Sequence, residues 1–152
     1  LDTMLAEEKK LVILARFVPE LDGIQELLKR KQIGYASVRG GVSNRAEEIR
    51  RFQEDAECRV FVGQIAAAGL GITLTAASTM VFYSLDYSMS NFEQAKARIH
   101  RVSQTENCLY IYLTAKHTVD TKILRALRDK ADLAKMLVDD YRNGSNPFQE
   151  GV

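Results

Sequence analysis

The chain has 152 residues, 46% of them hydrophobic and 27% charged, which is the composition of an ordinary globular domain. Its 21 Lys and Arg residues balance 20 Asp and Glu residues, so the formal net charge is +1. This balance excludes a strongly basic, histone-like chain, and any nucleic-acid contact must come from a local patch. No apolar run reaches the roughly 18 residues that cross a bilayer, so we expect no membrane partner.

Two absences narrow the chemistry. Cys58 and Cys108 form no Cys-x-x-Cys motif, so we expect reduced thiols of an intracellular protein and no metal site. No Gly-Lys dipeptide occurs, so the chain contains no phosphate-binding loop of the Gly-x-x-x-x-Gly-Lys-Ser/Thr kind.

Short apolar runs alternate with amphipathic stretches along the chain, and these predict strands and helices respectively. The predicted strands cover 11–15, 34–38, 59–62, 79–84 and 109–113. The predicted helices cover 19–31, a segment capped by Ser43 or Asn44 that carries Ile49 and Phe52, 90–102 behind a capping box of Ser90 and Glu93, and 119–141 with Ile123, Leu127 and Leu133 turned inward.

Strands that alternate with helices predict an α/β domain with a mainly parallel sheet. We expect this single domain to cover residues 1–142 and a flexible, turn-rich tail to cover 143–152. Ligands of such sheets bind beyond the carboxyl ends of the strands. The loops that follow the predicted strands are therefore the places to look for a site.

The sharpest local pattern is Gln94-x-x-x-Arg98-x-x-Arg101 on the predicted helix 90–102. At helical spacing these three side chains fall within roughly a 60° arc, with no acid at the same spacing to neutralise them. The arginine fork suits phosphate oxygens, and it stabilises charge where a phosphoryl group leaves. A solvated basic helix face is the alternative.

A second pattern runs from Gln64 to Thr75 and is rich in small residues directly after a strand. Gly69 and Gly71 would let a phosphate approach the backbone N–H groups, with hydroxyls from Thr73 and Thr75 beside them. A tight turn packed under the sheet explains the same residues.

Two further loops are open to more than one interpretation. Arg39 and Gly40 precede a capped helix and could hold a nucleic-acid phosphate or form a flexible turn. Asp86 has no acidic neighbour, so we expect a cap or loop residue there and not a metal ligand.

Taken in chain order, these stretches match a known arrangement of motifs. Gly69-Leu-Gly71-Ile-Thr73-Leu-Thr75 with Asp86-Tyr87, then Gln94-x-x-x-Arg98-x-His100-Arg101-Val-Ser-Gln104, resemble motifs V and VI of the Swi/Snf-type helicase-like ATPases of helicase superfamily two. Residues 11–17 resemble motif IV, 35–52 resemble the segment after it, and 120–144 resemble the closing helix of compact bacterial and phage members. Thr73 departs from the family, which usually has Asn there; the hydroxyl keeps a polar contact without the amide geometry.

The resemblance implies a RecA-like domain of three layers, with helices on both faces of the sheet. It implies the second of two motor lobes, working with an N-terminal lobe of the same polypeptide that carries the phosphate loop and the acidic metal-binding pair. ATP and Mg²⁺ would then be cofactors of the full-length protein, and neither would bind to this chain alone. The chain by itself would not hydrolyse ATP.

The resemblance also implies a role for each candidate residue. Arg98 and Arg101 would reach the γ-phosphate with Gln94 in support, whereas Gly69, Gly71 and Thr73 would couple the nucleotide to the nucleic acid. The partner would be double-stranded DNA, with RNA left open by the residues themselves. The residues that would touch its backbone are Arg16, Arg39, Gly40 and Gln64.

A different class of function uses the same residues. In a free-standing, non-enzymatic α/β module the arginine pair would be a docking surface for a nucleotide or a partner protein. A phosphate loop and an Asp-Glu motif upstream in the same gene would favour the motor.

Overall fold

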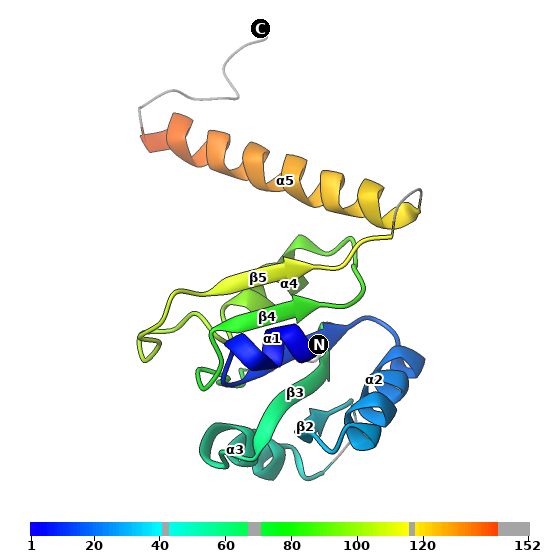
Figure 1. The fold of residues 1–152 in the computed structure, drawn as a ribbon. Coiled ribbons are helices and arrows are strands. Elements are labelled where there is room, and N and C mark those ends of the chain that lie inside the picture. The colour runs from blue at the N-terminus through cyan, green and yellow to red at the C-terminus, as the bar shows by residue number, and fades with distance from the viewer. Residues whose placement is uncertain (41–42, 67–70, 116–117, 143–152) are drawn as a thin grey trace, which may run out of the picture.

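A computed structural model describes residues 1–40, 43–66, 71–115 and 118–142 of the chain. The described residues form a five-stranded sheet in the order β2-β3-β1-β4-β5, in which every neighbouring pair is parallel (Figure 1). The strands are β1 (Leu11–Ala15), β2 (Gly34–Val38), β3 (Cys58–Gln64), β4 (Thr79–Phe82) and β5 (Leu109–Tyr112). The helices are α1 (Asp2–Glu7), α2 (Val18–Arg30), α3 (Arg45–Glu54), α4 (Met89–Lys96) and α5 (Val119–Arg142).

Helices cover both faces of the sheet, which confirms the predicted three-layer α/β fold. Along β1 the side chains alternate, so Val12 and Leu14 enter one core and Ile13 and Ala15 enter the other. The first core lies under α3, α4 and the start of α5, and the second lies under α1 and α2. No helix in the described part of the chain is long and apolar enough to cross a membrane.

Helix α1 is absent from the sequence prediction, and a tertiary contact explains why. The Arg59 guanidinium, on β3, donates to the carbonyl oxygens of Leu5 (2.7 Å), Glu8 (2.8 Å) and Lys9 (2.5 Å). These are the unpaired carbonyl groups at the end of the short helix. A side chain fifty residues away therefore caps α1, and no local pattern reports it.

The predicted helix 90–102 is wrong at both ends. Ser88 is the cap, since its hydroxyl accepts from the N–H of Asn91 at 3.2 Å, and the predicted capping box of Ser90 and Glu93 does not form. The helix ends at Lys96, and residues 97–103 continue as turns and bends. No Gly or Pro marks this end. The N–H of Leu74 donates to the carbonyl of Arg98 at 2.9 Å, so packing against another segment replaces the next helical turn.

Helix α5 matches its predicted range closely, but its inward face is shorter than predicted. Ile123 and Leu127 are buried in the core, as predicted. Leu133 is 54% exposed, so the prediction that it turns inward is wrong. The helix runs past the edge of the sheet, and its later turns have no core to enter (Figure 1).

The carboxyl ends of the central strands are joined by hydrogen bonds. The N–H of Ile65 donates to the carbonyl of Ala15 (3.1 Å), and the N–H of Tyr83 donates to that of Leu14 (2.8 Å). The N–H of Arg16 donates to the Ser84 hydroxyl at 2.7 Å. The loops after β1, β3 and β4 therefore start from one edge of the sheet, as predicted for parallel strands.

Candidate functional site

Two segments that are far apart in sequence pack together to form the candidate site. The first is 71–77, which returns the chain from β3 to β4, and the second is 97–104, which follows α4. The carbonyl of Arg98 accepts from Leu74, and the Gln104 amide donates to the carbonyls of Thr75 (3.3 Å), Ala77 (2.8 Å) and Ile99 (3.1 Å). One glutamine thus binds both segments, and they are held as a unit.

Helix α3 holds the same unit from the other side. The Gln53 amide donates to the Thr75 hydroxyl (3.2 Å) and accepts from the N–H of Ala76 (2.9 Å). The Thr75 hydroxyl, a candidate phosphate ligand from the sequence, is therefore engaged within the chain. Gln53 carries no signal in the sequence, and Gln104 stands there only as the end of the motif that begins at Gln94.

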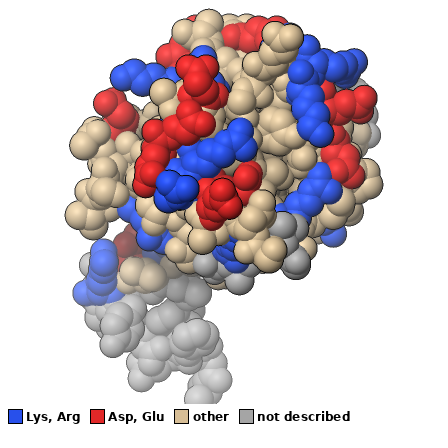
Figure 2. All heavy atoms as spheres, turned by 90° about the horizontal axis from the view of Figure 1, so that it is seen from below, with Lys and Arg blue, Asp and Glu red and all other residues tan. Residues whose placement is uncertain are grey.

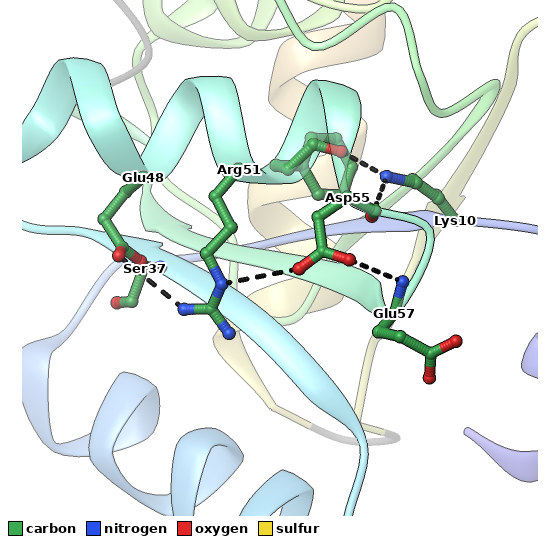
Figure 3. Close-up of polar contacts among 7 residues, drawn as sticks. Lys10, Ser37, Glu48, Arg51, Asp55 and Glu57 are labelled. Carbon is green, nitrogen blue, oxygen red and sulfur yellow. Dashed lines mark hydrogen bonds and ion pairs between the residues drawn. The ribbon is translucent and has the colours of Figure 1, made fainter.

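Helix α3 is itself fixed by polar contacts at its two ends (Figure 3). The Glu48 carboxylate accepts from the N–H of Ser37 on the edge strand β2 at 2.8 Å. Figure 3 shows Arg51 between Glu48 and Asp55, with N···O distances of 3.7 and 3.9 Å. Lys10 donates to the carbonyls of Phe52 and Asp55 at the carboxyl end of the helix.

Arg98 is the most unusual charged group in the described part of the chain. The residue is only 9% exposed, and its Nε has no hydrogen-bond partner among the described residues. Burial lowers the pKa of its guanidinium, and the nearby charges of Arg101 and Arg45 lower it further. A buried cation with cationic neighbours is costly unless an anion joins it. The orphaned N–H therefore fits an anionic group such as a phosphate.

Arg101 differs from Arg98 because its side chain is exposed and bonded. Its Nε donates to the carbonyl of Ala97 (3.2 Å), and its Nη1 donates to the Thr73 hydroxyl (3.0 Å). The structure thus brings together Arg98, Arg101 and Thr73, which the sequence placed in two separate motifs.

The predicted helical arc of Gln94, Arg98 and Arg101 is wrong. Only Gln94 lies on α4, where it is exposed and its amide donates to the Ser90 hydroxyl at 3.0 Å. The two arginines lie beyond the helix, one buried and one exposed, so they do not share a helix face. They are close in space because both lie in the turn after α4, and not because they share a helix face.

The glycines of the second motif are only partly described. Gly71 is exposed, has a φ of +73° and has open space where a side chain would stand. That left-handed backbone favours glycine. Gly69 lies outside the described residues. Gln64 ends β3 and is partly buried.

The remaining predicted residues form a second group, at the carboxyl ends of the strands. The Arg16 guanidinium is exposed and lies over the Phe17 ring, 5.0 Å from its centroid. Arg39 follows β2 and is ion-paired with Asp22, and Gly40 beside it is exposed. Among the described residues, no hydrogen bond or ion pair joins this group to the arginine pair.

The next feature is the set of described side chains that could ligate a metal ion. The described residues contain no group of three His, Cys, Asp or Glu side chains placed to hold a metal ion. Asp86 accepts from the Ser88 N–H and from the Asn91 amide (3.0 Å), which confirms it as a loop residue that supports the start of α4.

The surface charge bears on nucleic-acid affinity. Figure 2 shows basic and acidic side chains interspersed over the face in view, with no continuous basic field.

Comparison with known proteins gives one family and several long relatives. Residues 1–103 match the model of the helicase conserved C-terminal domain. The chain is 33% identical over 135 residues to a SWI/SNF-related matrix-associated actin-dependent regulator of chromatin subfamily A-like protein 1 from Drosophila melanogaster. The aligned region covers 88% of this chain and 18% of that protein. It is also 33% identical over 144 residues to the chromatin-remodeling ATPase INO80 of Mycosarcoma maydis. That aligned region covers 91% of this chain and 8% of the relative.

A solved structure agrees with the sequence relatives. The crystal structure of the C-terminal part of the Fun30 ATPase domain superposes with a TM-score of 0.77 at 25% identity, covering 82% of this chain and 41% of that one. The RecA-like fold is thereby confirmed. The two sequence relatives are eukaryotic, so they give no support to the bacterial or phage origin that the resemblance implied.

Proposed function

Because the chain belongs to the family of helicase conserved C-terminal domains, we propose that it is the second motor lobe of a Swi/Snf-type, ATP-dependent DNA translocase. The observation that carries the proposal is the buried, partly unpartnered guanidinium of Arg98 beside Arg101. The chain spans less than a fifth of the two curated relatives named above. A larger protein with a first lobe, called the two-lobed protein below, completes the motor.

The arginine pair supplies this lobe's part of the ATPase site. Bound ATP supplies a γ-phosphate whose transfer to water releases free energy. Arg98 offers an N–H with no competing acceptor among the described residues, and Arg101 offers an exposed fork. Two guanidiniums held by the protein stabilise charge that develops on a departing phosphoryl group, since they need no reorganisation in the reaction. The first lobe would hold the other phosphates and Mg²⁺.

The loops at the strand ends supply the grip on DNA. Arg16 is exposed, and Arg39 can exchange its exposed acidic partner for a phosphate. Gly40 presents backbone groups and Gln64 presents an amide at the same edge. Contacts of this kind recognise the phosphate backbone without reading sequence, as a translocase requires. The two relatives are named for chromatin, which favours double-stranded DNA over RNA.

Closure of the two lobes links these two groups of residues. Binding of ATP between the lobes draws the arginine pair toward the nucleotide, and its hydrolysis releases them. The strand-end loops move with the lobe, so each cycle shifts the grip along the DNA. The 152-residue chain alone has no phosphate loop and would not turn over ATP.

The test is DNA-stimulated ATP hydrolysis by the two-lobed protein carrying Arg101→Ala. An arginine of this kind contributes on the order of 10³–10⁵ to turnover, so we expect activity to fall by about that factor while DNA affinity stays unchanged. Arg125→Ala, at an exposed position on α5, is the matched control. Unchanged turnover in Arg101→Ala would refute the role of Arg101 at the γ-phosphate.

A further inference from the structure

The contact between Thr73 and Arg101 links the segment 71–77 to the turn after α4 that carries the arginine pair. The Nη1 of Arg101 donates to Thr73 Oγ1 at 3.0 Å, and its Nε donates to the carbonyl of Ala97 at 3.2 Å. One anchor lies in the turn that carries Arg101 itself, and the other lies across in the segment 71–77. The guanidinium plane is thus fixed at two points.

These two anchors leave part of the arginine available. A guanidinium has five N–H groups, and the two bonds occupy one on Nε and one on Nη1. The Nη2 group makes neither of these bonds, and the residue is exposed. A planar fork held at two points presents its remaining donors in one direction, which lowers the entropy lost when a phosphate binds.

The segment that carries Thr73 is also fixed, by hydrogen bonds to other parts of the chain. Leu74 is bonded to the carbonyl of Arg98, and Thr75 is bonded to both Gln53 and Gln104. Of the two residues before Thr73, Ile72 is buried, whereas Gly71 is exposed and has a positive φ. Thr73 is therefore flanked by the buried Ile72 on one side and by Leu74 and Thr75, which are hydrogen-bonded to other segments, on the other.

We propose that Thr73 is a positioning residue whose hydroxyl orients Arg101 for the phosphate. This inference rests on the proposed function, and it adds a specific acceptor atom, Thr73 Oγ1, to it.

The test compares Thr73→Val, which keeps the shape but removes the acceptor, with Thr73→Ser, which keeps the hydroxyl. In the two-lobed protein we expect Thr73→Val to lower kcat about two- to tenfold, the effect of one lost hydrogen bond, with KM for ATP unchanged. Thr73→Ser should restore kcat. Thr121→Val, at an exposed threonine on α5, is the matched control and should leave kcat unchanged.

A double-mutant cycle separates positioning from a general loss of stability. If Thr73 acts through Arg101, Arg101→Ala with Thr73→Val loses no more turnover than Arg101→Ala alone. Additive losses would overturn the inference, as would a Thr73→Ser variant as impaired as Thr73→Val. If Arg101→Ala is inactive and Thr73→Val matches the unmodified protein, the positioning role fails while the proposed function stands.

A second readout needs no nucleotide. Nitrogen-15 NMR of the 152-residue chain measures rotation of the Arg101 guanidinium about its Nε–Cζ bond. We expect rotation to be about two- to tenfold faster in Thr73→Val than in the unmodified chain and unchanged in Thr73→Ser. Equal rates in all three would show that Thr73 does not hold the arginine, and Thr73→Ala repeats the comparison if valine disturbs the spectrum.

Discussion

The backbone N–H of Leu74 donates to the carbonyl oxygen of Arg98 at 2.9 Å, which ties the segment after β3 to the turn after α4. This bond accounts for two features at once. It occupies the carbonyl that the N–H of Val102 would use if the helix continued, and it brings the buried Arg98 and the exposed Arg101 beside Thr73. The proposed phosphate site therefore depends on the packing of two segments and not on one helix face.

Of the glutamine substitutions that affect the unit formed by segments 71–77 and 97–104, Gln104→Ala should destabilise it most. The side chain donates to three carbonyl oxygens, those of Thr75, Ala77 and Ile99. Removing the donor leaves these partly buried acceptors unpaired, so we expect the free energy of unfolding to fall by about 1–3 kcal/mol. Urea unfolding measures it. Gln94→Ala, which removes a bond to Ser90 on the surface, is the control and should cost under about 0.5 kcal/mol.

Arg59→Ala should release α1 without unfolding the sheet. The guanidinium caps the carbonyl groups of Leu5, Glu8 and Lys9, and α1 is too short to persist alone. We expect faster amide hydrogen exchange throughout residues 2–7 and unchanged exchange in β1. Arg50→Ala, which removes a surface arginine paired with Glu54, serves as the control. Protected α1 amides in Arg59→Ala would contradict the capping role.

Two glycines should respond in opposite directions to the same substitution. A Cβ on Gly34 would lie 2.1 Å from the backbone oxygen of Glu57, so Gly34→Ala forces the β2–β3 edge apart and should cost about 1–3 kcal/mol. Gly23 lies in the middle of α2 with open space around it. Gly23→Ala should gain about 0.5–1 kcal/mol, because alanine is the better helix former. Thermal unfolding of the pair tests the register of β2, and equal shifts would contradict it.

Tyr110 gives the stability a dependence on alkaline pH. Burial, assisted by Cys108 and Tyr112, raises its pKa from 10 to about 12. The folded state holds this proton more tightly than the unfolded chain, so the stabilisation is present below pH 10 and is lost as the pH rises toward 12. Tyr110→Phe should therefore flatten the decline of the unfolding free energy over this interval, with the exposed Tyr83→Phe as control. Parallel pH curves for Tyr110→Phe and the unmodified chain would contradict the assignment.

Arg98→Met should make the folded chain more stable, and this sets Arg98 apart from ordinary core residues. Methionine has a similar length and needs no partner, whereas the guanidinium is buried beside two other arginine charges. We expect the free energy of unfolding to rise by about 1–3 kcal/mol, measured by urea unfolding. A loss of stability would mean that Arg98 is satisfied within the chain and serves its packing.

The elements that follow from local sequence were predicted well. The five-residue apolar run of β1 is fully buried, and its predicted bounds match the structure. The periodic face of α2 enters the core through Leu21, Ile24 and Leu28. In both cases the burial pattern is a property of neighbouring residues, so periodicity is sufficient to find it.

The elements that depend on distant residues were missed or misplaced. Helix α1 needs Arg59, the end of α4 needs Leu74, and the site needs Gln53 from α3. The sequence motifs named the correct arginines, but helical periodicity assigned them a shared face that they do not have. Tertiary hydrogen bonds decided each of these cases, and a single sequence does not show which carbonyl a distant N–H will meet.

The measurement that tests the account most directly is DNA-stimulated ATP turnover by the two-lobed protein carrying Arg98→Met. The account predicts a loss of at least about 10³-fold in a protein whose fold is more stable than the original, because the buried guanidinium serves the phosphate and not the core. Turnover within a few-fold of the unmodified protein would contradict it.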